Sequence, residues 1–96
     1  MFNNRLKRGF MKTFIVCTSD YYGIKEFRKG FSDFEKAVDY ATSIVLDRSN
    51  KYNEEYVKNT IRERHSDNIT DLFVYTDFHD MDYDEYVGIE EVEVEC

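Results

Sequence analysis

Carboxylates at alternating positions near the C-terminal end of the sequence could hold a hard cation. Asp80, Asp82 and Asp84 occupy positions 1, 3 and 5 of a twelve-residue segment, and Glu91 occupies position 12. In a calcium-binding loop these positions supply oxygen ligands that converge on one Ca²⁺ ion. The spacing therefore defines one candidate metal site, as an alternative to an interpretation without any metal.

The segment differs from a calcium-binding loop in two respects. Position 6 of such a loop is a glycine that allows a sharp turn, whereas this segment has Glu85 there. The residues on either side alternate as strands do and lack the periodicity of helices. The main interpretation is therefore a solvated acidic connection that binds no metal.

Four other residues have side chains suited to nucleophilic or zinc chemistry: Cys17, Cys96, His65 and His79. Their spacing contains neither a C-x-x-C nor an H-x₃-H pair, which argues against a structural zinc site. Cys17 lies in an apolar run and is predicted to be a small buried residue, where a thiol is inert. Because no glycine-rich phosphate loop is present either, the sequence predicts a protein that is not an enzyme and uses no cofactor.

Charge is divided unevenly along the chain. All 13 Lys and Arg residues precede residue 65, where they accompany nine acidic residues. Residues 65–96 hold eleven carboxylates and no Lys or Arg, and the whole chain has a net charge of −7. A surface of one sign repels nucleic acid and anionic lipid and attracts basic proteins. The charge therefore predicts a basic protein partner, without direct binding to nucleic acid or to a membrane.

The acidic tract also has a spacing that suits a binding surface. Carboxylates at alternating positions of a strand stand about 6.6–6.8 Å apart on one face. Tyrosine provides a large contact area at the centre of interfaces. The predicted partner-binding residues are the acidic and tyrosine side chains of the tract: Asp77, Asp80, Asp82, Tyr83, Asp84, Glu85, Tyr86, Glu91, Glu93 and Glu95.

This profile resembles in kind the small acidic proteins that phages use against host nucleic-acid enzymes, including anti-CRISPR and anti-restriction DNA mimics. The resemblance rests on size, charge and the lack of catalytic residues. It implies a viral inhibitor that occupies the basic groove of a host defence nuclease in the bacterial cytoplasm, as a monomer or homodimer. The alternatives are a Ca²⁺-binding module, a small oligomeric accessory protein, and an acidic surface that serves solubility alone.

The length of 96 residues and the absence of proline predict one domain. No apolar stretch approaches the roughly 18–20 residues that span a membrane, and two distant cysteines fit a reducing cytoplasm. Residues 1–10 are basic and end before a second methionine, Met11. They are interpreted either as a translated leader or as a basic arm, disordered or helical. The domain is expected to cover residues 11–96, with the acidic part at 65–96.

Periodicity predicts the elements of this domain. Alternating apolar residues predict strands over 11–21, 24–29, 70–78 and 86–95, and apolar side chains on both faces of the first make it a central strand. Gly30 is expected to end the second strand. In the last strand the apolar phase changes after Ile89, which predicts a β-bulge at Glu90–Glu91.

Two helices are predicted between these pairs of strands. The first begins at a capping box formed by Ser32 and Glu35 and ends near Arg48, and the second begins after Asn53 and stops within 65–68. The order ββααββ predicts an α+β domain with a four-stranded, mainly antiparallel sheet and both helices packed on one face.

Overall fold

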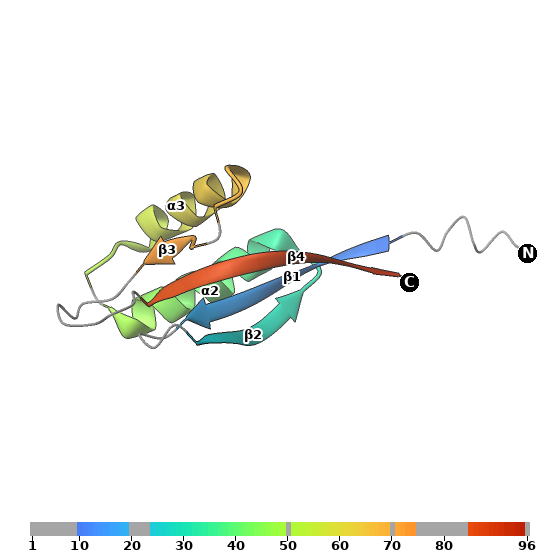
Figure 1. Ribbon diagram of the computed structural model, residues 1–96. Helices are drawn as coiled ribbons and strands as arrows, with labels where there is room; N and C mark the ends of the chain where they lie inside the picture. Colours follow the sequence, from blue (N-terminus) through green and yellow to red (C-terminus); the bar gives the residue numbers. More distant parts are fainter. Residues whose placement is uncertain (1–9, 20–23, 50, 70, 75–84, 96) are drawn as a thin grey trace, which may run out of the picture.

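The computed structural model describes residues 10–19, 24–49, 51–69, 71–74 and 85–95. These residues form a four-stranded sheet with two helices on one of its faces (Figure 1). The elements in chain order are β1 (Phe10–Ser19), β2 (Lys25–Phe31), α2 (Phe34–Arg48), α3 (Glu54–Ser66), β3 (Phe73–Val74) and β4 (Tyr86–Glu95). The α+β class and the order ββααββ predicted from the sequence are confirmed.

The sheet has the strand order β2-β1-β4-β3, and all neighbouring strands are antiparallel. β1 is a central strand, as its two apolar faces predicted, because Val16 packs beneath the helices while Cys17 is buried on the other face. β1 and β4 pair from Phe10 to Ser19, and this two-stranded ribbon extends past the helices towards the chain ends (Figure 1). Phe10, assigned to the leader from the sequence, thus belongs to β1.

The predicted bulge in β4 is wrong. β4 pairs with β1 without a register shift from Tyr86 to Glu95. The apolar phase changes because Val87 and Ile89 are buried beneath the helices, whereas Val92 lies on the opposite face and is partly exposed. One regular strand therefore places its apolar residues on different faces along its length.

The irregularity in the sheet lies between β1 and β2 instead, where the register shifts between Val16 and Cys17. Gly30 does not end β2 but lies within it, opposite Ile15. A Cβ atom at Gly30 would lie 3.3 Å from Cγ2 of Thr13, which is a tight contact. Of the predicted strand 70–78, the structure describes residues 71–74, of which only Phe73–Val74 form a strand, β3; residues 70 and 75–78 lie outside the described residues.

The helix ends follow from local hydrogen bonds. Asp33, and not the predicted Ser32, caps α2, because its carboxylate accepts a hydrogen bond from the backbone N–H of Glu35 at 2.9 Å. Asn53 caps α3 as predicted and accepts from the N–H of Tyr56 at 3.2 Å. α3 stops before Asn68, whose φ of 61° is left-handed, a conformation that asparagine tolerates better than most residues.

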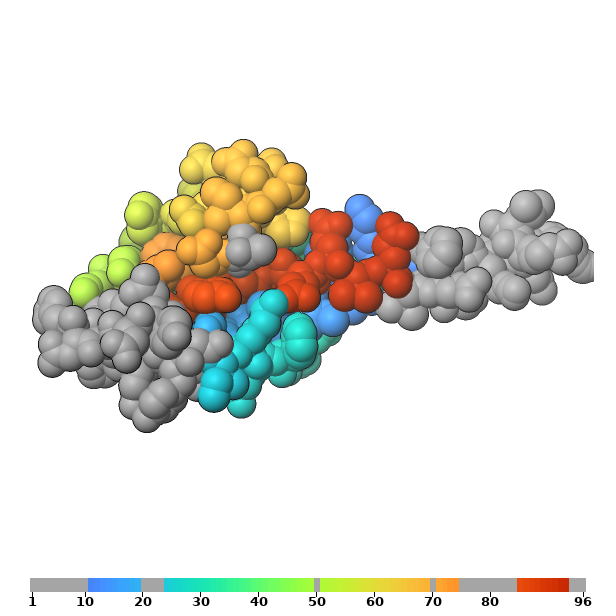
Figure 2. Space-filling model, viewed as in Figure 1, coloured from blue at the N-terminus to red at the C-terminus, as the bar shows by residue number. Residues whose placement is uncertain are grey.

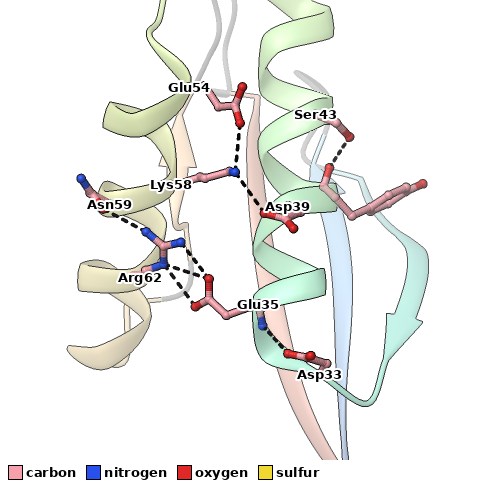
Figure 3. Close-up of polar contacts among 9 residues, drawn as sticks. Asp33, Glu35, Asp39, Ser43, Glu54, Lys58, Asn59 and Arg62 are labelled. Carbon is pink, nitrogen blue, oxygen red and sulfur yellow. Dashed lines mark hydrogen bonds and ion pairs between the residues drawn. The ribbon is translucent and has the colours of Figure 1, made fainter.

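Two groups of ion pairs tie α2 to α3 (Figure 3). The ammonium group of Lys58 lies 2.9 Å from Glu54 and 3.2 Å from Asp39, and hydrogen bonds to these carboxylates raise the pKa of Lys58. The guanidinium of Arg62 contacts both carboxylate oxygens of Glu35. Because such surface pairs add little stability, their main effect is to fix how the helices lie side by side.

The hydrophobic core lies between the helices and the sheet. Its edges contain aromatic pairs, with ring centroids 5.4 Å apart for Phe14 and Phe34 and 4.8 Å apart for Tyr52 and Phe73. Its fully buried members come from both layers: Val16, Ala37, Val38, Ala41, Val45, Val57, Ile61, Leu72 and Val87. No described helix is long and apolar enough to cross a membrane.

Ile61 is among the largest fully buried side chains of the described residues, so Ile61→Ala is expected to lower the free energy of unfolding by about 2–5 kcal/mol through lost burial and a cavity. Urea denaturation followed by circular dichroism would measure this change. The matched control is Ile24→Ala, because Ile24 is 59% exposed and its truncation should cost no more than about 0.5 kcal/mol. Equal effects of the two substitutions would contradict this core assignment.

Candidate functional site

Negative charge in the described structure is concentrated at β4. Between residues 10 and 74 the described ranges hold ten basic and ten acidic residues, so their charges cancel. Residues 85–95 hold no basic residue and five glutamates: Glu85, Glu90, Glu91, Glu93 and Glu95. We call residues 85–95 the β4 acidic site. Figure 2 shows the atoms of β4, in red, at the surface between α3 and β2.

Three of these glutamates occupy alternate positions of β4. The unbroken register pairs Glu91, Glu93 and Glu95 with Phe14, Lys12 and Phe10, and Glu91 and Glu93 lie on the same face as the buried Val87 and Ile89. Successive members of the row are about 7 Å apart along the strand. The row of alternating carboxylates predicted from the sequence is therefore present in the register, on the part of β4 that follows the buried residues.

Within the strand itself, basic side chains from other elements reach Glu90 and Glu91. The Nζ atom of Lys12 lies 3.6 Å from Glu91, and Nε2 of His65 lies 3.4 Å from the same carboxylate. On the opposite face Lys25 of β2 is hydrogen-bonded to Glu90, which raises the pKa of Lys25. Glu93 is exposed and forms no ion pair with any other described residue. Its charge is therefore less compensated than that of Glu91.

Glu85 has a different environment from the other four. Its side chain is 8% exposed and accepts a hydrogen bond from Nη2 of Arg48 at 2.8 Å. Both residues line a hollow of about 250 Å³ at the end of β1 and the start of β2, together with Thr18, Arg28 and Tyr40. A buried carboxylate is destabilising without a charged partner, so the pair with Arg48 joins the start of β4 to α2. Because it is buried, Glu85 adds little negative charge to the outer surface.

Half of the predicted partner-binding residues lie outside the described residues: Asp77, Asp80, Asp82, Tyr83 and Asp84. Tyr86 lies in β4 and is partly buried, on the face away from the helices and opposite Ser19. The structure thus places Glu91, Glu93 and Glu95 at alternate positions of one strand and turns Tyr86 to the face opposite Glu91 and Glu93. Glu85 lies apart from both, beside Arg48.

The second half of the candidate calcium loop is an extended strand. Tyr86 and Glu91, at loop positions 7 and 12, both belong to β4 and pair with β1. Five residues of a strand span about 17 Å, whereas both positions of a calcium loop contact one ion at about 2.3–2.6 Å. Glu91 therefore does not converge with position 7. Among the residues the structure describes, no cluster of three His, Cys, Asp or Glu side chains could hold a metal.

Cys17 and His65 do not form a nucleophile and its base. The ring of His65 packs on Phe34, with centroids 4.6 Å apart, on the helix side of the sheet. Cys17 lies on the other face, where burial raises the pKa of its thiol. The second histidine, His79, lies outside the described residues.

No family model, curated protein or solved structure matches this chain. A function for the chain consequently has to be inferred from the chemistry of its own residues, above all those of the β4 acidic site.

Removing the partner of Glu85 should destabilise the fold. Arg48→Gln is expected to lower the free energy of unfolding by about 1–3 kcal/mol at neutral pH, because it leaves a buried carboxylate without its hydrogen bond. The double variant Arg48→Gln/Glu85→Gln has no buried charge and should recover part of the loss. Chemical denaturation of wild type, both single variants and the double variant gives the comparison. A double variant less stable than Arg48→Gln would show that the pair has another role.

The raised pKa and burial of Cys17 predict a slow reaction with thiol reagents, because the thiolate is the reactive form. In a Cys96→Ser background, labelling of folded protein at pH 8 should be on the order of 100-fold slower than labelling in urea. A coloured disulfide reagent follows both rates. Similar rates in the two conditions would mean that β1 opens readily.

Proposed function

We propose that this chain is a non-catalytic acidic binding protein that occupies a cationic site of a larger partner through the β4 acidic site. The observation that carries the proposal is the distribution of charge. The positive and negative charges of the described residues up to Val74 cancel, and residues 85–95 add five glutamates. A surface of one sign steers association with an oppositely charged surface and discourages other partners. The remaining fold then serves to hold β4 in an extended, rigid form.

The row on β4 is less densely charged than nucleic acid. Its carboxylates are about 7 Å apart along the strand axis, whereas one DNA strand carries one phosphate per about 3.4 Å of helix axis. Lys12 lowers the charge of the row further, through its ion pair with Glu91. The row alone is therefore a weak electrostatic substitute for DNA. The four aspartates at 77–84, which precede β4 in the sequence, would extend the acidic surface.

The partner we propose is a bacterial nucleic-acid enzyme whose basic groove normally holds DNA or RNA. Arg and Lys side chains that bind phosphate bind carboxylate by the same charge-assisted hydrogen bonds. The chain would then be a phage-encoded inhibitor of a host defence nuclease, of the anti-CRISPR or anti-restriction type, acting in the host cytoplasm. This narrower form is supported by the small size, the charge and the resemblance in kind to the acidic inhibitors of phages.

The experiment that tests the proposal is an affinity pull-down from bacterial lysate at about 0.1 M and about 1 M salt, with recovered proteins identified by mass spectrometry. The Debye length falls from about 10 Å to about 3 Å over this range, which weakens an exposed electrostatic contact. One nucleic-acid enzyme retained only at low salt is the expected result. No partner at either salt would contradict the proposal.

Neutralising the row should weaken this binding specifically. The triple variant Glu91→Gln/Glu93→Gln/Glu95→Gln is expected to lower affinity for the captured partner on the order of tenfold and to reduce its salt dependence. The control changes the same charge on exposed helical sites, in Asp47→Asn/Glu55→Gln/Glu63→Gln. Calorimetric titration measures both affinities. Equal losses in the two triple variants would show that net charge, and not the row, controls binding.

A further inference from the structure

Among the residues that the structure describes, β4 has one paired edge and one largely open edge. β1 pairs with β4 from Tyr86 to Glu95, whereas β3 pairs only with Tyr86 and Val87 (Figure 1). In the described ranges no strand pairs with residues 88–95 on the β3 side. An edge of this kind presents unpaired backbone N–H and C=O groups that can bind another extended chain.

The direction of these backbone groups follows from one hydrogen bond. The N–H of Leu72 donates to the C=O of Val87 at 2.9 Å, so the backbone of Val87 faces away from β1. In an antiparallel strand this direction alternates from residue to residue. The outward-facing backbone groups along the open edge therefore belong to four residues: Ile89, Glu91, Glu93 and Glu95.

The side chains select the occupant of this edge. A strand added there would place its residues directly opposite Glu91, Glu93 and Glu95, on the same face and with Cβ atoms about 4.5–5.5 Å apart. Opposite charges stabilise such pairs and like charges destabilise them. The edge thus favours an incoming strand with Lys or Arg at alternate positions and disfavours an acidic one.

The opposite edge of the sheet has the opposite charge. β2 is the other edge strand, is exposed along most of its length, and contains Lys25, Arg28 and Lys29 with only one acidic residue, Glu26. A basic segment is repelled there. The β4 edge also has space beside it, since His65, Asn68 and Ile69 line a hollow of about 330 Å³ with residues 89–91.

We propose that the open edge of β4 binds an extended basic segment of the partner protein by strand addition, with Lys or Arg opposite Glu91, Glu93 and Glu95. This inference rests on the proposed function and specifies the part of the partner that is recognised. The backbone hydrogen bonds hold the segment in register, and the glutamates distinguish a basic segment from others. The partner element is a loop or strand with basic residues at every second position.

The test uses a capped seven-residue peptide with lysine at positions 2, 4 and 6 and valine or threonine elsewhere. Glu93→Pro and Glu93→Gln remove the same charge, but only proline also removes the outward N–H. Because that N–H does not face β1, the fold should tolerate proline, as edge strands do. Binding is followed by NMR titration at low salt, and the β1 amide signals report whether each variant is folded.

The expected result is a loss of about two- to fivefold for Glu93→Gln and a further loss of at least about tenfold for Glu93→Pro. A second probe is the same peptide with methylated backbone nitrogens at alternate positions, tested on wild type. This peptide keeps the charges but cannot form all the backbone hydrogen bonds with β4, so it should bind at least about tenfold more weakly. This probe needs no protein variant and decides the question if Glu93→Pro fails to fold.

Strand addition would be overturned if the lysine peptide bound equally well to both Glu93 variants and if both peptides bound equally well to the wild type. If the lysate partner were captured equally by both variants yet lost with the Glu91/Glu93/Glu95 triple, strand addition would fail while the proposed function stood. Peptide binding without any captured partner would contradict the proposed function alone. A dimer in light scattering that Glu93→Pro converts to a monomer would assign the edge to a second copy and overturn the peptide assignment.

Discussion

The antiparallel pairing of β1 with β4 is the interaction on which the rest of the structure depends. It joins Phe10–Ser19 to Tyr86–Glu95 over ten residue pairs and places β1 at the centre of the sheet. The helices cover only one part of this ribbon, which buries Val16, Val87 and Ile89. The unbroken register then carries the glutamates beyond the covered part. One strand thus contributes to the core at its start and to the acidic surface at its end.

The same pairing sets how much of the negative charge is compensated. Lys12 and Lys25 lie far from β4 in the sequence, but the strand order brings them to Glu91 and Glu90. These are surface pairs, which contribute little stability and weaken as salt rises. A binding partner that offers better-placed cations can therefore compete for the same carboxylates at small cost. Glu85 is the exception, because it is buried beside Arg48 and its carboxylate is not exposed to a binding partner.

The fold was predictable to the extent that it depends on local periodicity. Both helices, the central position of β1 and the element order follow from alternating or helical spacing of apolar residues, and Asn53 was recognisable as a cap. The bulge prediction failed because it assumed one buried face along all of β4, whereas Val92 lies on the other face where the helices no longer cover the sheet. The row Glu91, Glu93 and Glu95 follows from period-two spacing, but its ion pairs and the open edge depend on strand order, for which the sequence contains no local signal.

The pairing of β1 with β4 also has a consequence for how the chain folds as it leaves the ribosome. β1 is synthesised first among the described elements and β4 last, so the central strand lacks one neighbour until about 70 further residues have been made. The local contacts of β1 with β2 and of α2 with α3 can form earlier, whereas closing this long loop is slow because of its entropy. Until then an apolar strand edge stays exposed, as in other folding intermediates that chaperones protect. β4 is therefore the strand that completes the sheet and ends this period of vulnerability.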